Sequence, residues 1–241
     1  MRLGALLVPG NPAGLAEQAR QLEGEGYESI WSAQAMGRGF LMTDPFVALS
    51  AAAAVTSEVE LGTAILQLPL YNATDTALKA LSLDQISGGR FILGVGAGST
   101  ESDYQIHRED FGGRFQTFET RLQQLQDTLK DGSANGGNVG ASGGPPLFFG
   151  TWGKNVERAA SEFDGWIASG MHRTPAQCAQ AIPRYRQAGG QRAIVSTIQV
   201  LPDTDLGEMK DILAAYAEAG FDDAVVMVLA ADKLGAVRQL V

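Results

Sequence analysis

The side chains best suited to move a proton are two histidines, His107 and His172. Imidazole changes its charge near neutral pH, so either could act as an acid or a base in catalysis. His172 follows an apolar run that ends at Ser169, whereas His107 closes the polar stretch 104–107. A histidine in a loop is often simply exposed to solvent, and that second interpretation stays open for both.

A second chemical feature is the segment 150–155, which reads Gly-Thr-Trp-Gly-Lys-Asn before a predicted helix. Gly150 and Gly153 would let the backbone approach an anion, and the start of the helix would direct amides toward it. The Thr151 hydroxyl adds a donor and Lys154 a positive charge, although Lys154 also fits a solvated surface lysine. This pattern favours the binding of a phosphate group.

A third feature is the glycine series Gly94, Gly96 and Gly98, which follows a short apolar run. The series has part of the spacing of a dinucleotide-binding fingerprint. It lacks the third spacing, the immediate helix and the later acidic residue. The alternative is that these glycines only turn the chain.

The elements that must position these residues alternate regularly along the chain. Eight apolar runs suit buried parallel strands, and they lie at 3–8, 27–32, 59–66, 91–95, 147–149, 165–169, 193–201 and 224–229. Helical patterns separate them, and the clearest of these runs from Phe115 to Leu129. This alternation predicts a (β/α)8 TIM barrel that forms a single domain over residues 1–241. A ligand would then bind at the carboxyl ends of the strands, in the loops 34–36, 67–72, 96–101, 150–155, 169–172 and 201–204.

Two breaks in the pattern carry further expectations. The segment 131–144 is rich in glycine, serine and asparagine and predicts a mobile surface loop. Pro183 falls within the helix that Thr174 and Pro175 begin, and it should kink or end that helix.

Composition excludes several classes of protein. The chain of 241 residues is 45% hydrophobic, carries a formal charge of −9 and has one cysteine, Cys178. No intramolecular disulfide is possible, no Cys/His cluster indicates a metal site, and the acidity argues against nucleic-acid or anionic-membrane partners. The apolar run 3–8 is too short for a signal peptide, so we expect a cytoplasmic location.

Several motifs in order carry a resemblance to a known family. The sequence GTAILQLP at 62–69 precedes LDQISGGRFILGVGAG at 83–98, and DPFVA at 44–48 and GWI at 165–167 also match. With these motifs the chain resembles the bacterial luciferase-like monooxygenases. The resemblance implies a (β/α)8 barrel that binds reduced flavin mononucleotide (FMN) or the deazaflavin F420.

The resemblance also implies where a cofactor would lie. The ring would lie against a non-prolyl cis peptide that falls on Ala64 and Ile65, and the phosphate would lie at the 150–155 loop. Arg114 matches an arginine that reaches the phosphate, although it also fits an exposed arginine at a helix start. With the neighbouring strand ends, the cofactor-binding residues are expected to be Gln34, Ala64, Ile65, Gly96, Arg114, Gly150, Thr151, Trp152, Gly153, Asn155 and Ser169.

The family pattern fails at its known acid and base residues. Gln34-Ala35-Met36 stand where luciferases carry Glu-His-His, Ser99 replaces a glutamate of F420-dependent sugar dehydrogenases, and Ala97 replaces a second phosphate-binding arginine. Light emission and sugar-phosphate oxidation are therefore disfavoured. Met36 and Phe40 suggest an apolar substrate mouth, and Tyr71 a hydrogen-bonding partner for the substrate or the cofactor.

Three functions remain open at this stage. The first is a monooxygenase that uses reduced FMN and O2 on a small apolar substrate and receives its flavin from a separate reductase. The second is an F420-dependent oxidoreductase that transfers a hydride, and the third is a flavin-binding protein without turnover. The resemblance also implies a homodimer, formed through the helices at 45–55 and 76–86.

Overall fold

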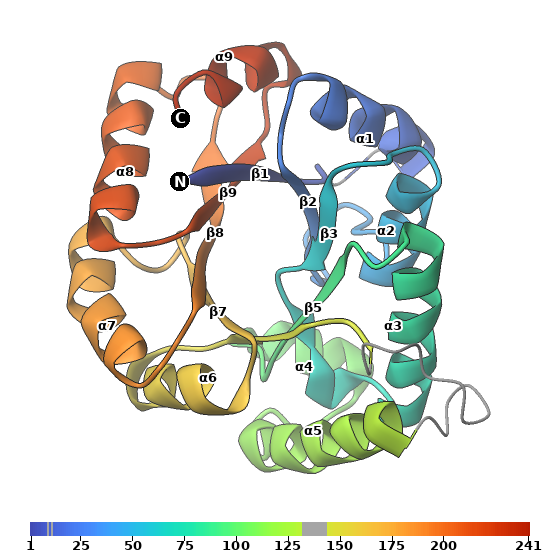
Figure 1. Cartoon of the computed structure of the whole chain (residues 1–241). Coiled ribbons are helices and arrows are strands. Elements are labelled where there is room, and N and C mark those ends of the chain that lie inside the picture. The colour runs from blue at the N-terminus through green and yellow to red at the C-terminus, as the bar shows by residue number, and fades with distance from the viewer. Residues whose placement is uncertain (9, 11, 132–143) are drawn as a thin grey trace.

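The computed structural model describes residues 1–8, 10, 12–131 and 144–241. Its strands are β1 (Arg2–Leu6), β2 (Ser29–Ser32), β3 (Glu60–Thr63), β4 (Leu66–Gln67), β5 (Phe91–Gly96), β6 (Leu147–Gly150), β7 (Gly165–Ser169), β8 (Arg192–Val200) and β9 (Asp223–Val228). All pairings are parallel, and the order β3-β2-β1-β9-β8-β7-β6-β5-β4 is closed by a further pairing of β3 with β5. Because β3 and β4 are two halves of one barrel strand, the expected eight-stranded (β/α)8 barrel is confirmed (Figure 1).

The third barrel strand is divided by a bulge. Leu61 pairs with Phe91, but Leu66 pairs with Val95, so the strand gains one residue relative to β5. The Ala64–Ile65 peptide in this bulge is cis. The Thr63 hydroxyl replaces the missing backbone ladder, since it donates to Gly94 O at 2.7 Å and accepts from Gly94 N at 2.9 Å.

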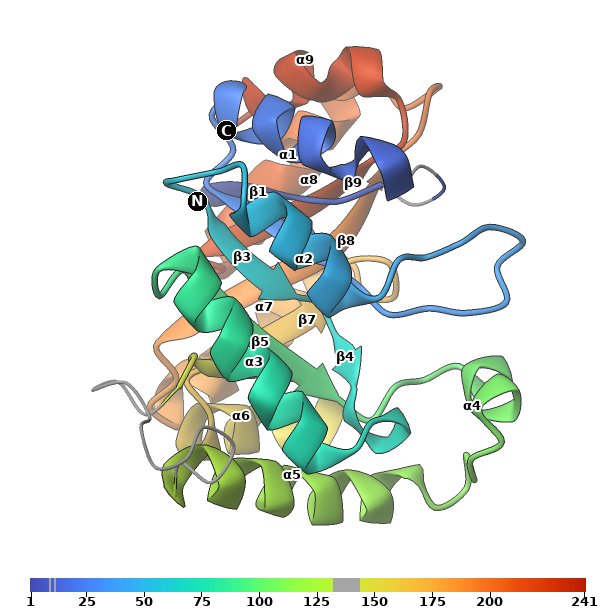
Figure 2. The ribbon, with the colours of Figure 1, turned by 90° about the vertical axis from the view of Figure 1, so that its right-hand side faces the viewer.

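The helices surround the barrel as a ring (Figures 1 and 2). They are α1 (Leu15–Gly24), α2 (Pro45–Ala53), α3 (Ala73–Ser87), α4 (Glu101–His107), α5 (Arg114–Asp131), α6 (Val156–Glu162), α7 (Pro175–Gln187), α8 (Leu206–Ala219) and α9 (Leu234–Arg238). Sequence patterns mark several starts: Asp44 caps α2 with a 2.9 Å bond from Phe46 N, and Thr174 and Gln177 form a capping box on α7.

The helices α4 and α7 differ from the sequence-based prediction, and the predicted loop 131–144 falls mostly outside the described residues. The short helix α4 was not predicted, because its seven residues are too few for a clear periodic pattern. The helix α7 does not end at Pro183 but continues to Gln187. The side chain of Pro183 is exposed to solvent. Most of the predicted loop 131–144 lies outside the described residues.

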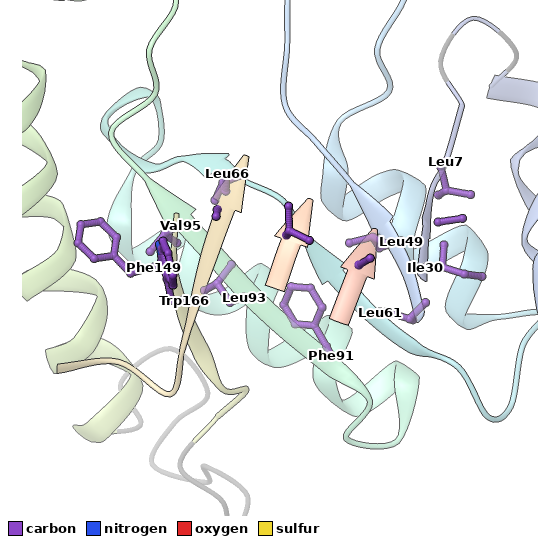
Figure 3. Close-up of a cluster of buried hydrophobic side chains, with 14 of the residues drawn as sticks. Leu7, Ile30, Leu49, Leu61, Leu66, Phe91, Leu93, Val95, Phe149 and Trp166 are labelled. Carbon is purple, nitrogen blue, oxygen red and sulfur yellow. The ribbon is translucent and has the colours of Figure 1, made fainter. Parts of the chain in front are cut away.

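Two apolar layers hold the barrel. The side chains inside it come from alternate positions of the strands: Leu6, Trp31, Ala64, Ile92, Phe148, Ile167, Ile194 and Val225. A larger cluster fills the space between strands and helices, and Figure 3 shows part of it around Leu61, Phe91, Phe149 and Trp166. This two-sided burial explains why the strands read as continuous apolar runs in the sequence.

The amino-terminal end of the barrel is closed by four paired charges. The Arg192 side chain lies 2.8 Å from the carboxylate of Asp223 and 2.7 Å from that of Glu60, and Arg2 also contacts both acids. Burial opposes the ionisation of Glu60, but hydrogen bonds from Arg192 and Arg2 outweigh it and keep the pKa of Glu60 below its ordinary value. We call these four residues the basal cluster.

Candidate functional site

Ile65 packs on the side chains inside the barrel and lies against Gly96 and Gly150, the last residues of β5 and β6. A Cβ atom on Gly96 would lie 2.6 Å from Ile65 Cδ1 and 2.7 Å from Gly150 O. A Cβ atom on Gly150 would lie 2.4 Å from Ile65 Cγ2. The structure therefore brings the bulge and the loops after β5 and β6 together on one face, as predicted.

Close packing within the protein explains the glycine series. A Cβ atom on Gly94 would lie 2.0 Å from Thr63 O, and one on Gly98, whose φ is +74°, would lie 2.0 Å from Gln67 Oε1. With Gly96 packed against Ile65, all three positions need glycine for contacts inside the chain. Contacts within the chain are thus enough to explain the glycines of this partial fingerprint.

A polar network joins the loops after β2, β4 and β5. Gln34 accepts a 2.9 Å bond from Gln67 N through Oε1, and its own backbone N–H donates to Ile65 O at 3.3 Å. Gln67 Nε2 donates to Asp103 Oδ2 at 2.8 Å, whereas Gln67 Oε1 is buried without a partner among the described residues. Gln34, predicted to contact the cofactor, orders the strand end that carries Gln67.

The two histidines lie on different elements and make different contacts. His107 Nδ1 lies 2.8 Å from Asp103 O, one turn earlier on α4. His172 is exposed in the turn after β7, where its backbone N–H donates to Ser169 O at 3.1 Å. The geometry thus favours the interpretation of His172 as an exposed loop residue. Ser169 stabilises this turn through its carbonyl oxygen.

The predicted anion loop lies between β6 and α6. Gly153 has a φ of +69° and open space around its Cα, at the start of a 3-10 turn (Gly153–Asn155) that leads into the seven-residue α6. Trp166 Nε1 fixes the loop by donating to Thr151 O at 3.0 Å. The first amides of such a turn have no acceptor within the helix, so they can bind an anion.

Two arginines that sequence reasoning missed lie against this loop. The Arg173 guanidinium lies 4.8 Å from the centre of the Trp152 ring, and Arg184 Nη2 donates to Gly153 O at 2.8 Å. Arg184 is also paired with Glu157, whereas Lys154 is simply exposed. The position of Arg173 in the sequence could have indicated it. Arg173 directly follows the sixth predicted strand and its turn, and the ligand loops were expected at the carboxyl ends of the strands.

Arg114 is the first residue of α5. Its guanidinium lies between the rings of Phe111 and Phe115, 3.8 Å and 4.2 Å from their centres, and its Nε is buried without a partner among the described residues. The helices α5 and α6 are joined by a 2.8 Å bond from Arg158 to Glu119. Arg114 is therefore held at the start of α5 by the two rings and by a 2.9 Å bond from Nη1 to Phe111 O.

The segment after β2, predicted to form an apolar substrate mouth, carries exposed apolar side chains. Phe40 is 49% exposed and Leu41 65% exposed, and Met36 is also exposed. Figure 2 shows this segment projecting on the same side of the barrel as α4. Tyr71, predicted to bind substrate or cofactor, donates its hydroxyl to Asp44 at 3.1 Å, and burial together with that carboxylate raises the pKa of Tyr71.

The chain belongs to the luciferase-like monooxygenase family, whose model matches residues 1–220. It is 36% identical to 4-hydroxyprotoasukamycin monooxygenase of Streptomyces nodosus over 42% of this chain and 30% of that protein. It is 28% identical, over 85% of this chain and 68% of the other, to a protein of Mycobacterium tuberculosis named provisionally as a coenzyme F420-dependent oxidoreductase. An F420-dependent secondary alcohol dehydrogenase shares the fold with a TM-score of 0.83, at 16% identity over 100% of this chain and 98% of that one.

Two further observations concern metal-binding groups and membrane spans among the described residues. Across 1–8, 10, 12–131 and 144–241, no group of three or more His, Cys, Asp or Glu side chains could hold a metal ion. Within the same ranges, no helix has the length and apolar character needed to cross a membrane.

Proposed function

We propose that this protein is a luciferase-like monooxygenase that uses reduced FMN and O2 on a small apolar substrate. The observation that carries the proposal is the position of Ile65, which lies over Gly96 and Gly150 where the ligand loops meet. Its contacts fix the bulge as a rigid surface against which a flat ring can lie. The similarity to a monooxygenase from Streptomyces supports the reaction type.

The residues around the anion loop fit a cofactor that carries a phosphate. Arg114 offers a buried Nε without a partner among the described residues, and Arg173 offers a guanidinium held against Trp152. Gly153 leaves open space, and the first amides of its turn point along the start of α6. In the proposed complex Thr151, Trp152, Gly153 and Asn155 hold the phosphate, while Ala64 and Ile65 support the ring.

The cofactor, when bound, supplies the electrons for the reaction with oxygen. The protein would hold the cofactor and the substrate in place and exclude water from them. Phe40 and Leu41 are exposed at the mouth, where a bound apolar substrate would cover them and exclude water. The histidine that luciferases use is replaced by Ala35, so we assign no acid or base at that position and keep His107 and His172 as candidates only.

A second function, F420-dependent hydride transfer, has a specific observation in its favour. F420 carries an anionic tail, and Lys154 and Arg173 lie on or against the loop where such a tail would leave the barrel, whereas the charge of Arg184 is paired with Glu157. The similarity to the mycobacterial protein points the same way.

Ligand titration and oxygen uptake together test the proposal. We expect reduced FMN to bind more tightly than F420, and oxygen to be consumed when a flavin reductase and a medium-chain apolar aldehyde or ketone are supplied. Preferential binding of F420, with no oxygen uptake, would replace the first function by the second. Binding of FMN without any turnover would instead indicate a flavin-binding protein, and binding of neither cofactor would reject both enzymatic functions.

We also propose a homodimer that uses the outer faces of α2 and α3. Val47 on α2 and Leu78 and Ile86 on α3 are exposed apolar side chains, and the two helices pack side by side. Leu78→Glu should therefore weaken self-association, because it places a charge in an apolar contact. Sedimentation of wild type and variant at micromolar concentration measures this, and a wild-type monomer would reject the proposed dimer.

A further inference from the structure

Asp103 is a buried carboxylate on α4 that no part of the proposed chemistry uses. Its side chain is 2% exposed. Oδ1 accepts from Met36 N at 3.2 Å and from Arg38 Nη1 at 2.9 Å, while Oδ2 accepts from Arg38 Nη2 at 3.1 Å and from Gln67 Nε2 at 2.8 Å. One carboxylate thus binds four donors from two other segments of the chain.

The contact with Arg38 has the geometry of a strong ion pair. Two parallel bonds join the guanidinium to the two carboxylate oxygens, an arrangement that fixes orientation as well as distance. Arg38 also donates to Met36 O, which closes the turn around Gly37. Gly37 has a φ of +66°, and a Cβ atom there would lie 2.7 Å from Ile106 Cδ1 on α4. The mouth segment is therefore shaped to lie against α4.

The contact with Gln67 reaches the opposite side of the network. An ionised carboxylate can only accept hydrogen bonds, so Asp103 fixes which end of the Gln67 amide faces it. Gln67 in turn binds the Gln34 backbone and side chain beside the bulge. Asp103 thus links the apolar mouth to the strand end next to Ile65.

We propose that Asp103 is a positioning residue that anchors the mouth segment 36–41 over the site and orients the Gln67 amide. This inference rests on the proposed function for its catalytic meaning, but the anchoring itself needs no cofactor. In the apolar mouth, Phe40 and Leu41 keep a fixed position only while Arg38 is held. Loss of Asp103 should therefore weaken substrate binding more than it slows the reaction at saturating substrate.

Hydrogen exchange of the free protein, followed by mass spectrometry, tests the anchor directly. In Asp103→Asn the amides of 36–41 should exchange about tenfold faster than in wild type, because the ion pair with Arg38 is lost. Arg38→Lys should give an intermediate increase, since lysine keeps the charge but not the paired geometry. Glu101→Gln is the matched control: it removes an exposed carboxylate from the same first turn of α4 and should leave exchange of 36–41 unchanged.

Two outcomes would overturn the inference. The first is wild-type exchange of 36–41 in both Asp103→Asn and Arg38→Lys, and the second is an equal increase in Glu101→Gln. If Asp103→Asn does not fold, Arg38→Lys decides alone, because Arg38 is partly exposed. With turnover, KM should rise in Asp103→Asn while kcat changes little. A confirmed anchor in a protein that binds neither FMN nor F420 would reject the proposed function and leave the anchor standing.

Discussion

The two ends of the barrel treat their polar groups in opposite ways. At the amino-terminal end, the basal cluster of Arg2, Glu60, Arg192 and Asp223 pairs every charge with two partners. At the carboxyl-terminal end, Gln67 Oε1 and Arg114 Nε are buried with no partner among the described residues. Buried polar groups normally find partners because an unpaired one costs free energy. The basal end is thus fully paired, whereas the other end leaves two polar atoms unpaired, and we propose that this second end binds the ligand.

The largest expected effect comes from breaking the basal cluster. Arg192→Ala leaves the buried Asp223 and the half-buried Glu60 with Arg2 alone, which lies 2.7 Å from Glu60 but 3.6 Å from Asp223. Removing one partner from such a pair should lower the free energy of unfolding by about 3 kcal/mol. Urea denaturation of wild type and variant measures the loss. Cofactor affinity of the folded variant should stay at the wild-type value, and a parallel loss of affinity would contradict the division between the two ends.

The next largest effect is expected on FMN affinity, from changes at the anion loop on the carboxyl-terminal end of the barrel. Gly153→Asp places a negative charge beside the proposed phosphate and an aspartate at a φ of +69°, so it should weaken FMN binding. Arg114→Ala removes one charge-assisted contact, worth about 1.5–3 kcal/mol. We expect the glycine variant to lose more affinity than the arginine variant in FMN titrations.

Gly153→Ala controls for the backbone strain of the first variant, because it shares the positive φ without the charge. Its affinity should fall between those of wild type and Gly153→Asp. If Gly153→Asp keeps wild-type affinity and a wild-type circular dichroism spectrum, the phosphate lies elsewhere.

The smallest effect is a change in pH dependence at the basal end. The pKa of Glu60 is lowered from 4.5 in the folded protein, so its ionised form stabilises the fold fully above pH 4.5. That contribution is lost as pH falls below 4.5 through the lowered pKa. Glu60→Gln lacks the titrating group, so the stability difference between wild type and variant should shrink as the pH is lowered. Thermal unfolding from pH 7 to pH 3 measures it, and a constant difference would contradict the assignment.

The fold followed from the sequence because each barrel strand is buried on both faces. The run 165–169 was predicted with its observed bounds, and the runs at 193–201 and 224–229 each differ by one residue at either end. The third strand differs most, since its single run 59–66 is interrupted at Ala64 and Ile65. The resemblance to the family, rather than the apolar pattern, indicated that interruption.

The site was less accessible to sequence reasoning because it depends on contacts between distant segments. Asp103 lies in a stretch without a helical period, and its partners are about 65 and 36 positions away in the chain. In the sequence, Arg184 resembles an ordinary charged residue of a surface helix, and Arg173 resembles one of the loop before that helix. Gly96, predicted as part of a ligand loop, is glycine because Ile65 and the Gly150 carbonyl leave no room for a side chain.

The packing of Ile65 also determines the order in which substitutions at positions 65 and 150 can be accepted during evolution. A methyl group on Gly150 would meet Ile65 Cγ2 at 2.4 Å, and the next atom, Ile65 Cβ, lies at 3.4 Å. Alanine at 150 is therefore tolerable once residue 65 has become small, but not before. A methyl group on Gly96 would still meet the Gly150 carbonyl at 2.7 Å, whatever residue stands at 65. Among relatives that keep this backbone, position 150 should thus vary together with position 65, whereas position 96 should stay glycine.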